Sequence, residues 1–376
     1  MNRIQIRDVA LEWPRLFGLL WLFVFLAACN ESVTAPKSVL VIEHEGRLER
    51  GSTVRFSATL NGTPATAVLW TADPVTAVQW TAPGEARLLT TGIVRIFGAS
   101  GKNSGSDALT VTLPPSLLFE RAEDGQNDIW RMALDGGDLV RLVQNSAQDR
   151  WPTAAAGLIY FVSYRVAPAA VFAAPITGGS GDRVSTASGV YEEAAISPDG
   201  RNLLFTRASG GVNKLFISDP TGANAYRADP SSGAAIEVSP AWSSDGKRIT
   251  YVSTAAGNAD IYVVNVDGGA AQAVVKTPAT EVEPAWSPDG KQIVFARSTS
   301  SGTHLFTIDI TSHQEHQITS QPGTQARPVW LTDGRIAFTV TSGSQHFLYW
   351  VDPTSPDPIH EVAGSPDIAG RLSVLP

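Results

Sequence analysis

Cysteine, methionine and histidine are scarce in this chain of 376 residues, which contains one, two and six of them respectively. A single cysteine, Cys29, excludes an intrachain disulfide and any metal site that needs several thiolates. His313 and His316 are the only histidines close together, and with His304 they have no carboxylate or thiol at ligand spacing except Glu315. Because a metal site normally needs three ligands with supporting contacts, we expect no metal ion and no cofactor.

Motifs of common catalytic sites are also missing. The sequence has no Gly-x-Ser-x-Gly pentapeptide for a hydrolase nucleophile. The glycine-rich stretches 98–101 and 178–181 lack a following Lys-Ser or Lys-Thr pair, so they do not indicate phosphate binding. Neighbouring residues of an extended strand point to opposite faces, so Glu192 and Glu193 cannot work together as an acid and a base. We therefore predict no catalytic residues.

No apolar run is long enough to span a bilayer. The longest, residues 16–28, follows Arg3, Arg7 and Arg15, and this arrangement is typical of an export signal over residues 1–28. The tetrad Leu26-Ala27-Ala28-Cys29 resembles the bacterial lipobox. The resemblance implies cleavage before Cys29, lipidation of Cys29, and anchoring to the membrane without spanning it.

Two further features near this cysteine concern location. Asn30 follows Cys29 where an aspartate would favour the inner membrane, so the resemblance implies an outer-membrane lipoprotein facing the periplasm or the cell surface. Residues 29–37 are polar and aperiodic, and we expect them to be a lipidated tether.

Basic residues are fewer than acidic residues in this chain. The chain has 28 Lys and Arg against 36 Asp and Glu, a formal net charge of −8. Nucleic acids and anionic surfaces attract basic proteins, so we expect no nucleic-acid partner.

Amphipathic helical periodicity is missing after residue 30, whereas short alternating apolar runs separated by Gly, Pro, Asn and Asp are frequent. We therefore predict an all-β fold. Within it, an apolar triplet ending in an aromatic residue recurs six times, and an apolar–aromatic pair ends 11 residues after each triplet. The triplet aromatics, spaced by 42, 44, 46, 44 and 43 residues, are Phe119, Phe161, Phe205, Tyr251, Phe295 and Phe338. This period predicts a six-bladed β-propeller of four-stranded blades over residues 116–376.

A turn motif containing Asp-Gly lies between the copies, as in Trp286-Ser287-Pro288-Asp289-Gly290. Proline, aspartate and glycine are the residues of hairpin turns, so we assign these aspartates to turns and not to catalysis. The motif and its spacing resemble the repeat of TolB-like propellers. That resemblance implies a module that binds other macromolecules. The four copies of the motif contain Asp199, Asp245, Asp289 and Asp333.

Residues 38–113 contain several alternating strands and resemble bacterial Ig-like domains, through Val68-Leu69-Trp70, residues 91–96 and Leu109-Thr110-Val111. The resemblance implies an Ig-like β-sandwich. Pro114-Pro115 favours an extended backbone, and we place the boundary between the two domains there.

The two ends of the propeller are predicted to pair. No turn motif precedes the first strand at Leu117, whereas a stretched version, residues 365–372, follows the last copy. We expect the C-terminal strand to complete the first blade, because that leaves no open sheet edge.

A mostly acidic set of residues is predicted at the mouth of the propeller channel. Positions three residues before the inner-strand aromatic, or its equivalent, include Ser239 and three of the charged residues named below. We propose them as candidates for holding a cation or a basic segment of a partner; the alternative is that the arginines simply pair with the carboxylates. The charged members, called the mouth set, are Asp149, Arg150, Glu193, Glu237, Glu281, Glu283 and Arg327.

Two functions remain open from the sequence. The first is a membrane-anchored, non-catalytic module that binds a protein or polysaccharide partner in the cell envelope. The alternative is a polysaccharide-active glycosidase or lyase that uses acids such as Glu193 and Glu283. Two opposed carboxylates about 5–10 Å apart would favour the enzyme, and a channel filled by side chains would favour the binding module.

Overall fold

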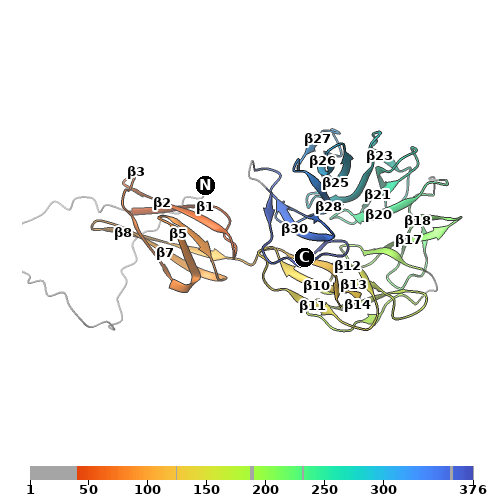
Figure 1. Cartoon of the computed structure of the whole chain (residues 1–376), viewed down its shortest axis with the longest axis horizontal. Coiled ribbons are helices and arrows are strands. Elements are labelled where there is room, and N and C mark those ends of the chain that lie inside the picture. The colour runs from red at the N-terminus through yellow and green to blue at the C-terminus, as the bar shows by residue number, and fades with distance from the viewer. Residues whose placement is uncertain (1–39, 124, 187–189, 231–232, 356–358, 376) are drawn as a thin grey trace, which may run out of the picture. The chain divides into compact units, whose positions relative to one another are not determined.

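A computed structural model describes residues 40–123, 125–186, 190–230, 233–355 and 359–375 (Figure 1). The chain divides into two compact units, Met1–Pro114 and Pro115–Pro376. Every element in the described ranges is a strand, apart from one 3-10 helix, Val75–Ala77, so the all-β class is confirmed. The predicted signal peptide, Cys29 and the tether lie outside the described residues. None of the described segments forms a helix long and apolar enough to cross a membrane.

The N-terminal unit consists of two antiparallel sheets. The first has the order β1-β2-β6-β5, with β3 beside β2; its strands are β1 (Leu40–Glu45), β2 (Thr53–Leu60), β3 (Thr63–Pro64), β5 (Val78–Ala82) and β6 (Glu85–Leu88). The second has the order β4-β7-β8; its strands are β4 (Leu69–Asp73), β7 (Gly92–Ser100) and β8 (Asn103–Val111).

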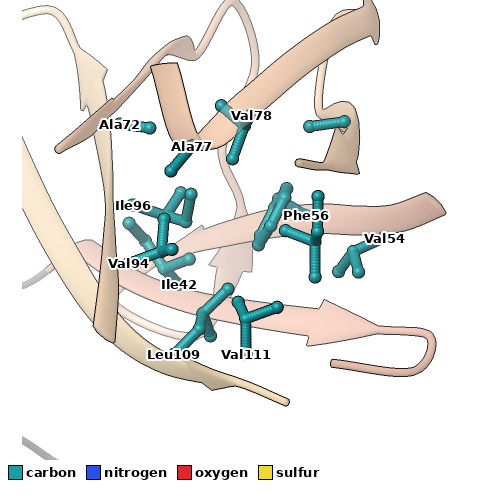
Figure 2. Close-up of a cluster of buried hydrophobic side chains, with 12 residues drawn as sticks. Ile42, Val54, Phe56, Ala72, Ala77, Val78, Val94, Ile96, Leu109 and Val111 are labelled. Atoms are coloured by element: carbon teal, nitrogen blue, oxygen red, sulfur yellow. The ribbon is translucent and has the colours of Figure 1, made fainter. Parts of the chain in front are cut away.

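One apolar core lies between these two sheets (Figure 2). On β2, buried and exposed residues alternate, because successive side chains of a strand point to opposite faces. Val54 and Phe56 of the first sheet therefore meet Val94 and Ile96 of β7 and Leu109 of β8 in the same cluster. Trp70 and Trp80 pack against the edge of this core, with ring centroids 6.4 Å apart.

The C-terminal unit is built from six four-stranded groups, numbered 1 to 6 in chain order. Group 1 consists of β32 (Ser373–Val374), β9 (Ser116–Glu123), β10 (Gln126–Ala133) and β11 (Val140–Val143). Group 2 consists of β12 (Asp149–Ala155), β13 (Leu158–Ser163), β14 (Ala170–Pro175) and β15 (Asp182–Arg183). Group 3 consists of β16 (Glu192–Ile196), β17 (Leu203–Ser209), β18 (Val212–Ser218) and β19 (Tyr226–Arg227). Group 4 consists of β20 (Glu237–Trp242), β21 (Arg248–Ser253), β22 (Asp260–Asn265) and β23 (Gln272–Val275). Group 5 consists of β24 (Glu281–Trp286), β25 (Gln292–Thr299), β26 (Gly302–Asp309) and β27 (Glu315–Gln317). Group 6 consists of β28 (Gly323–Trp330), β29 (Ile336–Ser342), β30 (Gln345–Val351) and β31 (His360–Glu361). A short parallel pairing between β26 and β28 joins groups 5 and 6 into one eight-stranded sheet.

The repeated aromatic residues face each other across the central hairpin of each group. Phe161 of β13 lies directly opposite Phe172 of β14, and Phe295 of β25 lies opposite Phe306 of β26. Their ring centroids are 6.2 and 6.0 Å apart, a favourable distance for aromatic pairs. The two aromatic residues of each copy are 11 positions apart because they face each other on the two strands of one hairpin.

Apolar clusters join each group to its neighbours. Six clusters of buried side chains each contain residues of two adjacent groups, and one of them joins group 6 to group 1. The groups therefore follow one another around a closed ring, and the last lies beside the first (Figure 1). We call each contact between neighbouring groups a seam.

The predicted pairing of the two ends is confirmed. Ser373 and Val374 of β32 pair with Leu118 and Leu117 of β9. The pairing strand begins just after the predicted stretch 365–372, which instead crosses the seam and buries Ile368 and Leu372.

The Asp-Gly motifs form tight turns, as predicted. Ser287 Oγ donates to Asp289 Oδ1 at 2.7 Å and accepts the N–H of Gln292 at 2.9 Å. Asp289 also accepts the N–H of Lys291, and equivalent bonds recur at Asp199 and Asp245. The hydrogen bond from Ser287 lowers the pKa of Asp289, so the carboxylate acts as a turn acceptor.

Candidate functional site

The inner strands of the C-terminal unit surround a cavity of about 170 Å³, here called the central cavity. Its wall contains two acids and two arginines among apolar side chains. It is lined by Trp151, Glu193, Ser239, Glu283, Pro284, Ala285, Arg327, Pro328, Val329, Arg371 and Leu372.

Five of these residues occupy one equivalent backbone position. Trp151, Glu193, Ser239, Glu283 and Arg327 have φ angles of 53°, 48°, 53°, 55° and 55°, and each lies where the pairing of its inner strand shifts register. A β-bulge of this kind bends the strand and redirects a side chain. Left-handed backbone is uncommon for residues other than glycine, so its fivefold recurrence is a built feature of the repeat.

Three bulges bind a carboxylate of the preceding group. A bulge leaves one residue unpaired in the ladder, so its N–H is available to another acceptor. The Ser239 N–H donates to Glu193 Oε2 at 2.8 Å, and the Arg327 N–H donates to Glu283 Oε2 at 2.6 Å. In the same way, the Trp151 N–H donates to Glu120 Oε1 at 2.9 Å. Carboxylates of groups 1, 3 and 5 are thus fixed by groups 2, 4 and 6.

Arg371 brings a positive charge among these three carboxylates. Its Nη2 donates to the carbonyl oxygen of Pro240 at 2.8 Å, on group 4 across the ring. Burial lowers the pKa of Arg371, and the negative charges of Glu193, Glu283 and Glu120 oppose that shift. Burial also raises the pKa of Glu193, although the Ser239 N–H and the Arg371 guanidinium oppose the rise.

The segment that carries Arg371 is fixed on both sides. Ala369 N–H donates to the Glu120 carbonyl oxygen at 2.8 Å, and Arg327 Nη1 donates to the Ile368 carbonyl oxygen at 2.8 Å. Gly370 lies directly against the Glu120 carboxylate, where a Cβ atom would collide with it. A larger residue at position 370 would therefore have to displace the Glu120 carboxylate, which accepts the Trp151 N–H.

The mouth set is divided by the structure. Glu193, Glu283 and Arg327 line the central cavity together with Ser239. Arg150 does not line the cavity; its guanidinium lies over the Trp151 ring, 4.9 Å from the centroid, and its Nε is 3.4 Å from Glu120 Oε2. The cavity is nevertheless not mostly acidic, because Arg371 and Arg327 balance Glu193 and Glu283.

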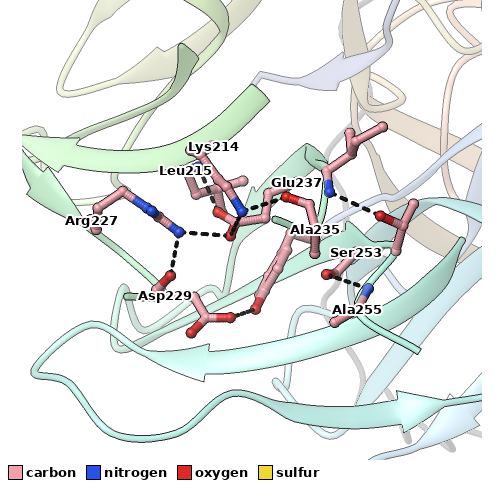
Figure 3. Close-up of polar contacts among 11 residues, drawn as sticks. Lys214, Leu215, Arg227, Asp229, Ala235, Glu237, Ser253 and Ala255 are labelled. Atoms are coloured by element: carbon pink, nitrogen blue, oxygen red, sulfur yellow. Dashed lines mark hydrogen bonds and ion pairs between the residues drawn. The ribbon is translucent and has the colours of Figure 1, made fainter. Parts of the chain in front are cut away.

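Asp149, Glu237 and Glu281 are fully buried at the seams and do not line the central cavity. Each of them lies two residues before the bulge residue of its inner strand. Glu237 accepts the N–H of Leu215 at 2.7 Å and pairs with Lys214 and Arg227 (Figure 3). Arg297 Nε donates to Glu281 Oε1 at 2.8 Å, and Asn145 donates to Asp149. Burial raises the pKa of Asp149 to about 6.

Sequence reasoning missed Arg371, Trp151 and Glu120. Arg371 lies 44 residues after Arg327, the same step that separates Arg327 from Glu283, so the repeat period held a signal for it. A second signal was the proline that follows four of the five bulges; these prolines are Pro152, Pro240, Pro284 and Pro328.

The histidines of group 5 have separate surroundings. His304 is buried, and its ring contacts Gln325 at 2.7 Å and Ser301 at 2.8 Å. His313 lies in a turn with φ 56°, and His316 lies on the exposed strand β27. Within the described ranges, no group of three or more His, Cys, Asp or Glu residues is placed to hold a metal ion.

The C-terminal unit has sequence similarity to TolB proteins. Residues 212–360 match the family model described as TolB beta propeller domain. A curated relative, protein TolB homolog of Chlorobium luteolum, is 29% identical over 119 residues, which are 32% of this chain and 26% of that protein. The match thus spans about a quarter of that relative's length.

Solved structures show the same fold at low sequence identity. TolB from Acinetobacter baumannii superposes with a TM-score of 0.60 and 14% identity, covering 89% of this chain and 82% of that one. A TolB from Agrobacterium tumefaciens gives 0.55 and 16%, covering 70% and 98%. A puromycin-hydrolysing peptidase of Mycobacterium tuberculosis gives 0.51 and 11%, covering 85% of this chain and 52% of that one. The C-terminal unit is therefore similar to TolB β-propellers in sequence over residues 212–360 and in its fold.

Proposed function

We propose that this protein is a non-catalytic binding module of the cell envelope. A lipid on Cys29 anchors it to the outer membrane, a bacterial Ig-like domain over residues 38–113 acts as a spacer, and a six-bladed propeller over 116–376 binds a partner protein. The observation that carries the proposal is the central cavity, where charged and apolar side chains from five inner strands and the C-terminal segment converge.

The contacts of the cavity favour binding over catalysis. Glu193 and Glu283 each accept a backbone N–H of the next group, which fixes them as hydrogen-bond acceptors. Arg371 lies in the field of both carboxylates. A general acid and base for glycoside cleavage need room between them for the sugar and water, and a buried guanidinium that interacts with both acids works against that use.

A protein partner fits the cavity better than a uniform polyanion or polycation, because the wall carries both charges beside Trp151 and two prolines. Aromatic and arginine side chains are common anchors in protein interfaces. Relatedness to TolB proteins supports an envelope location, and the lipobox supports the anchor.

The test is crosslinking capture from intact cell envelopes with the full-length chain. Capture should be repeated with Glu193→Gln/Glu283→Gln and, as a matched control, with Glu361→Gln, whose side chain is exposed on β31. We expect one protein to be captured by the parent and by the control, and much less by the double variant. Equal capture by all three would refute the role of the cavity, and enrichment of glycan alone would favour the polysaccharide enzyme.

A further inference from the structure

Four charged side chains of the central cavity face one another without direct pairing. Glu193, Glu283, Arg327 and Arg371 all line it. Among the residues that the structure describes, no nitrogen–oxygen contact of 4.0 Å or less joins Arg327 or Arg371 to a carboxylate. This differs from the buried acids Glu237 and Glu281, which Lys214, Arg227 and Arg297 contact directly.

Backbone contacts hold these four charges apart. One oxygen of each glutamate is bound to a bulge N–H, and one nitrogen of each arginine is bound to a carbonyl oxygen, Pro240 or Ile368. The remaining oxygens and nitrogens have hydrogen-bonding capacity left, since a carboxylate accepts up to four bonds and a guanidinium donates five. The cavity is thus a preorganised polar site in which backbone contacts keep the glutamates and arginines from forming ion pairs with one another.

The balance of charge selects against ligands of one sign. A purely anionic group at Arg371 would lie in the field of Glu193, Glu283 and Glu120, which act on that arginine. A purely cationic group at Glu193 or at Glu283 would meet the positive charge of Arg371, which interacts with both carboxylates. Each single-charge ligand therefore gains one attraction and suffers one repulsion.

We propose that the central cavity binds a zwitterionic segment of the partner, in which an acidic and a basic side chain are neighbours. The carboxylate binds Arg327 and Arg371, the ammonium or guanidinium group binds Glu193 and Glu283, and the intervening chain packs on Trp151 and Pro328. This inference rests on the proposed function and adds the chemistry of the recognised segment.

The test uses blocked tetrapeptides and calorimetry with the purified full-length chain in detergent. Acetyl-Gly-Glu-Lys-Gly-amide carries both charges, and its Gln-Lys and Glu-Gln analogues carry one each. The reversed pair, Lys-Glu, covers the opposite orientation. We expect one zwitterionic peptide to bind at least about tenfold more tightly than both single-charge analogues, since hydrogen bonds between charged groups are the strong ones.

Variants then assign the charges. Glu283→Gln and Arg327→Gln should each abolish the preference for the zwitterion, whereas Arg201→Gln, a substitution at an exposed turn arginine, should keep it. Preference for the cationic peptide would overturn the proposal in favour of an acidic site, and preference for the anionic peptide would overturn it in favour of a basic one. Binding of none would also overturn it. The peptide comparison uses the parent chain, so it does not depend on whether a variant folds. If no peptide preference is found but envelope capture still depends on the cavity, the zwitterion proposal fails and the proposed function stands.

Discussion

Glu281 and Glu283 lie two residues apart on β24, yet they belong to different regions of the molecule. Glu281 is buried at the seam between groups 4 and 5 and is paired with Arg297. Glu283 follows the register shift, lines the central cavity and is held by a backbone N–H. The same residue type is therefore part of a buried ion pair at one position and, as we propose, contacts the partner at the other. The register shift at the bulge gives the two glutamates these different surroundings.

The seams should dominate stability, and the seam between groups 6 and 1 offers the largest effect. Ending the chain before Ser365 removes β32 together with the buried side chains of Ile368 and Leu372. Each buried aliphatic side chain is worth about 2–5 kcal/mol, so we expect a fall in melting temperature of roughly 10 °C or more. Thermal unfolding followed by circular dichroism measures it. A truncated chain that melts like the parent would show that the ring does not depend on this closure.

A charged seam gives the next effect. Glu237→Ala leaves Lys214 buried, with only 2% of its side chain exposed, and removes the carboxylate beside it. Uncompensated buried charge costs about 3–5 kcal/mol, so the free energy of unfolding should fall by that order. Urea titration measures the change. Lys214→Met/Glu237→Leu is the control, because removing both charges should restore much of the stability; a double variant as unstable as Glu237→Ala would contradict the explanation.

Asp149 makes a third seam sensitive to pH. Burial raises its pKa from 3.8 to about 6, so the folded state holds this proton more tightly than the unfolded chain does. Its contribution to stability is fully present below pH 3.8 and is lost as pH rises through about 6. Asp149→Asn should therefore weaken the loss of stability between pH 4 and 6 by up to roughly 3 kcal/mol. Urea titrations at several pH values test this, and an unchanged pH slope would contradict it.

The architecture followed from the sequence because its signals are local. The aromatic residues of each copy lie opposite each other across a hairpin, so a constant offset of 11 residues revealed the strand pairs. The missing first turn motif and the extra C-terminal segment likewise predicted that β32 joins β9.

The central cavity was only partly predictable. Counting back from the aromatic residues found Glu193, Glu283 and Arg327, but the same set also included Glu237 and Glu281, two residues further out, which are buried and do not line the cavity. The bulge decides which residue enters the cavity, and a bulge in a strand has no side-chain signature beyond the proline that follows it. Arg371 was missed because it lies within residues 365–372, which were interpreted as a stretched version of the turn motif.

The most direct test of the central claim compares Glu281→Gln with Glu283→Gln in one experiment, measuring melting temperature and envelope capture for both. Glu281→Gln should lower the melting temperature while the folded chain still captures the partner, since it weakens the contact with Arg297 and leaves the cavity intact. Glu283→Gln should keep the melting temperature within about 2 °C of the parent and reduce capture about tenfold. The account is contradicted if Glu283→Gln captures as well as the parent, or if both variants lose stability and capture together.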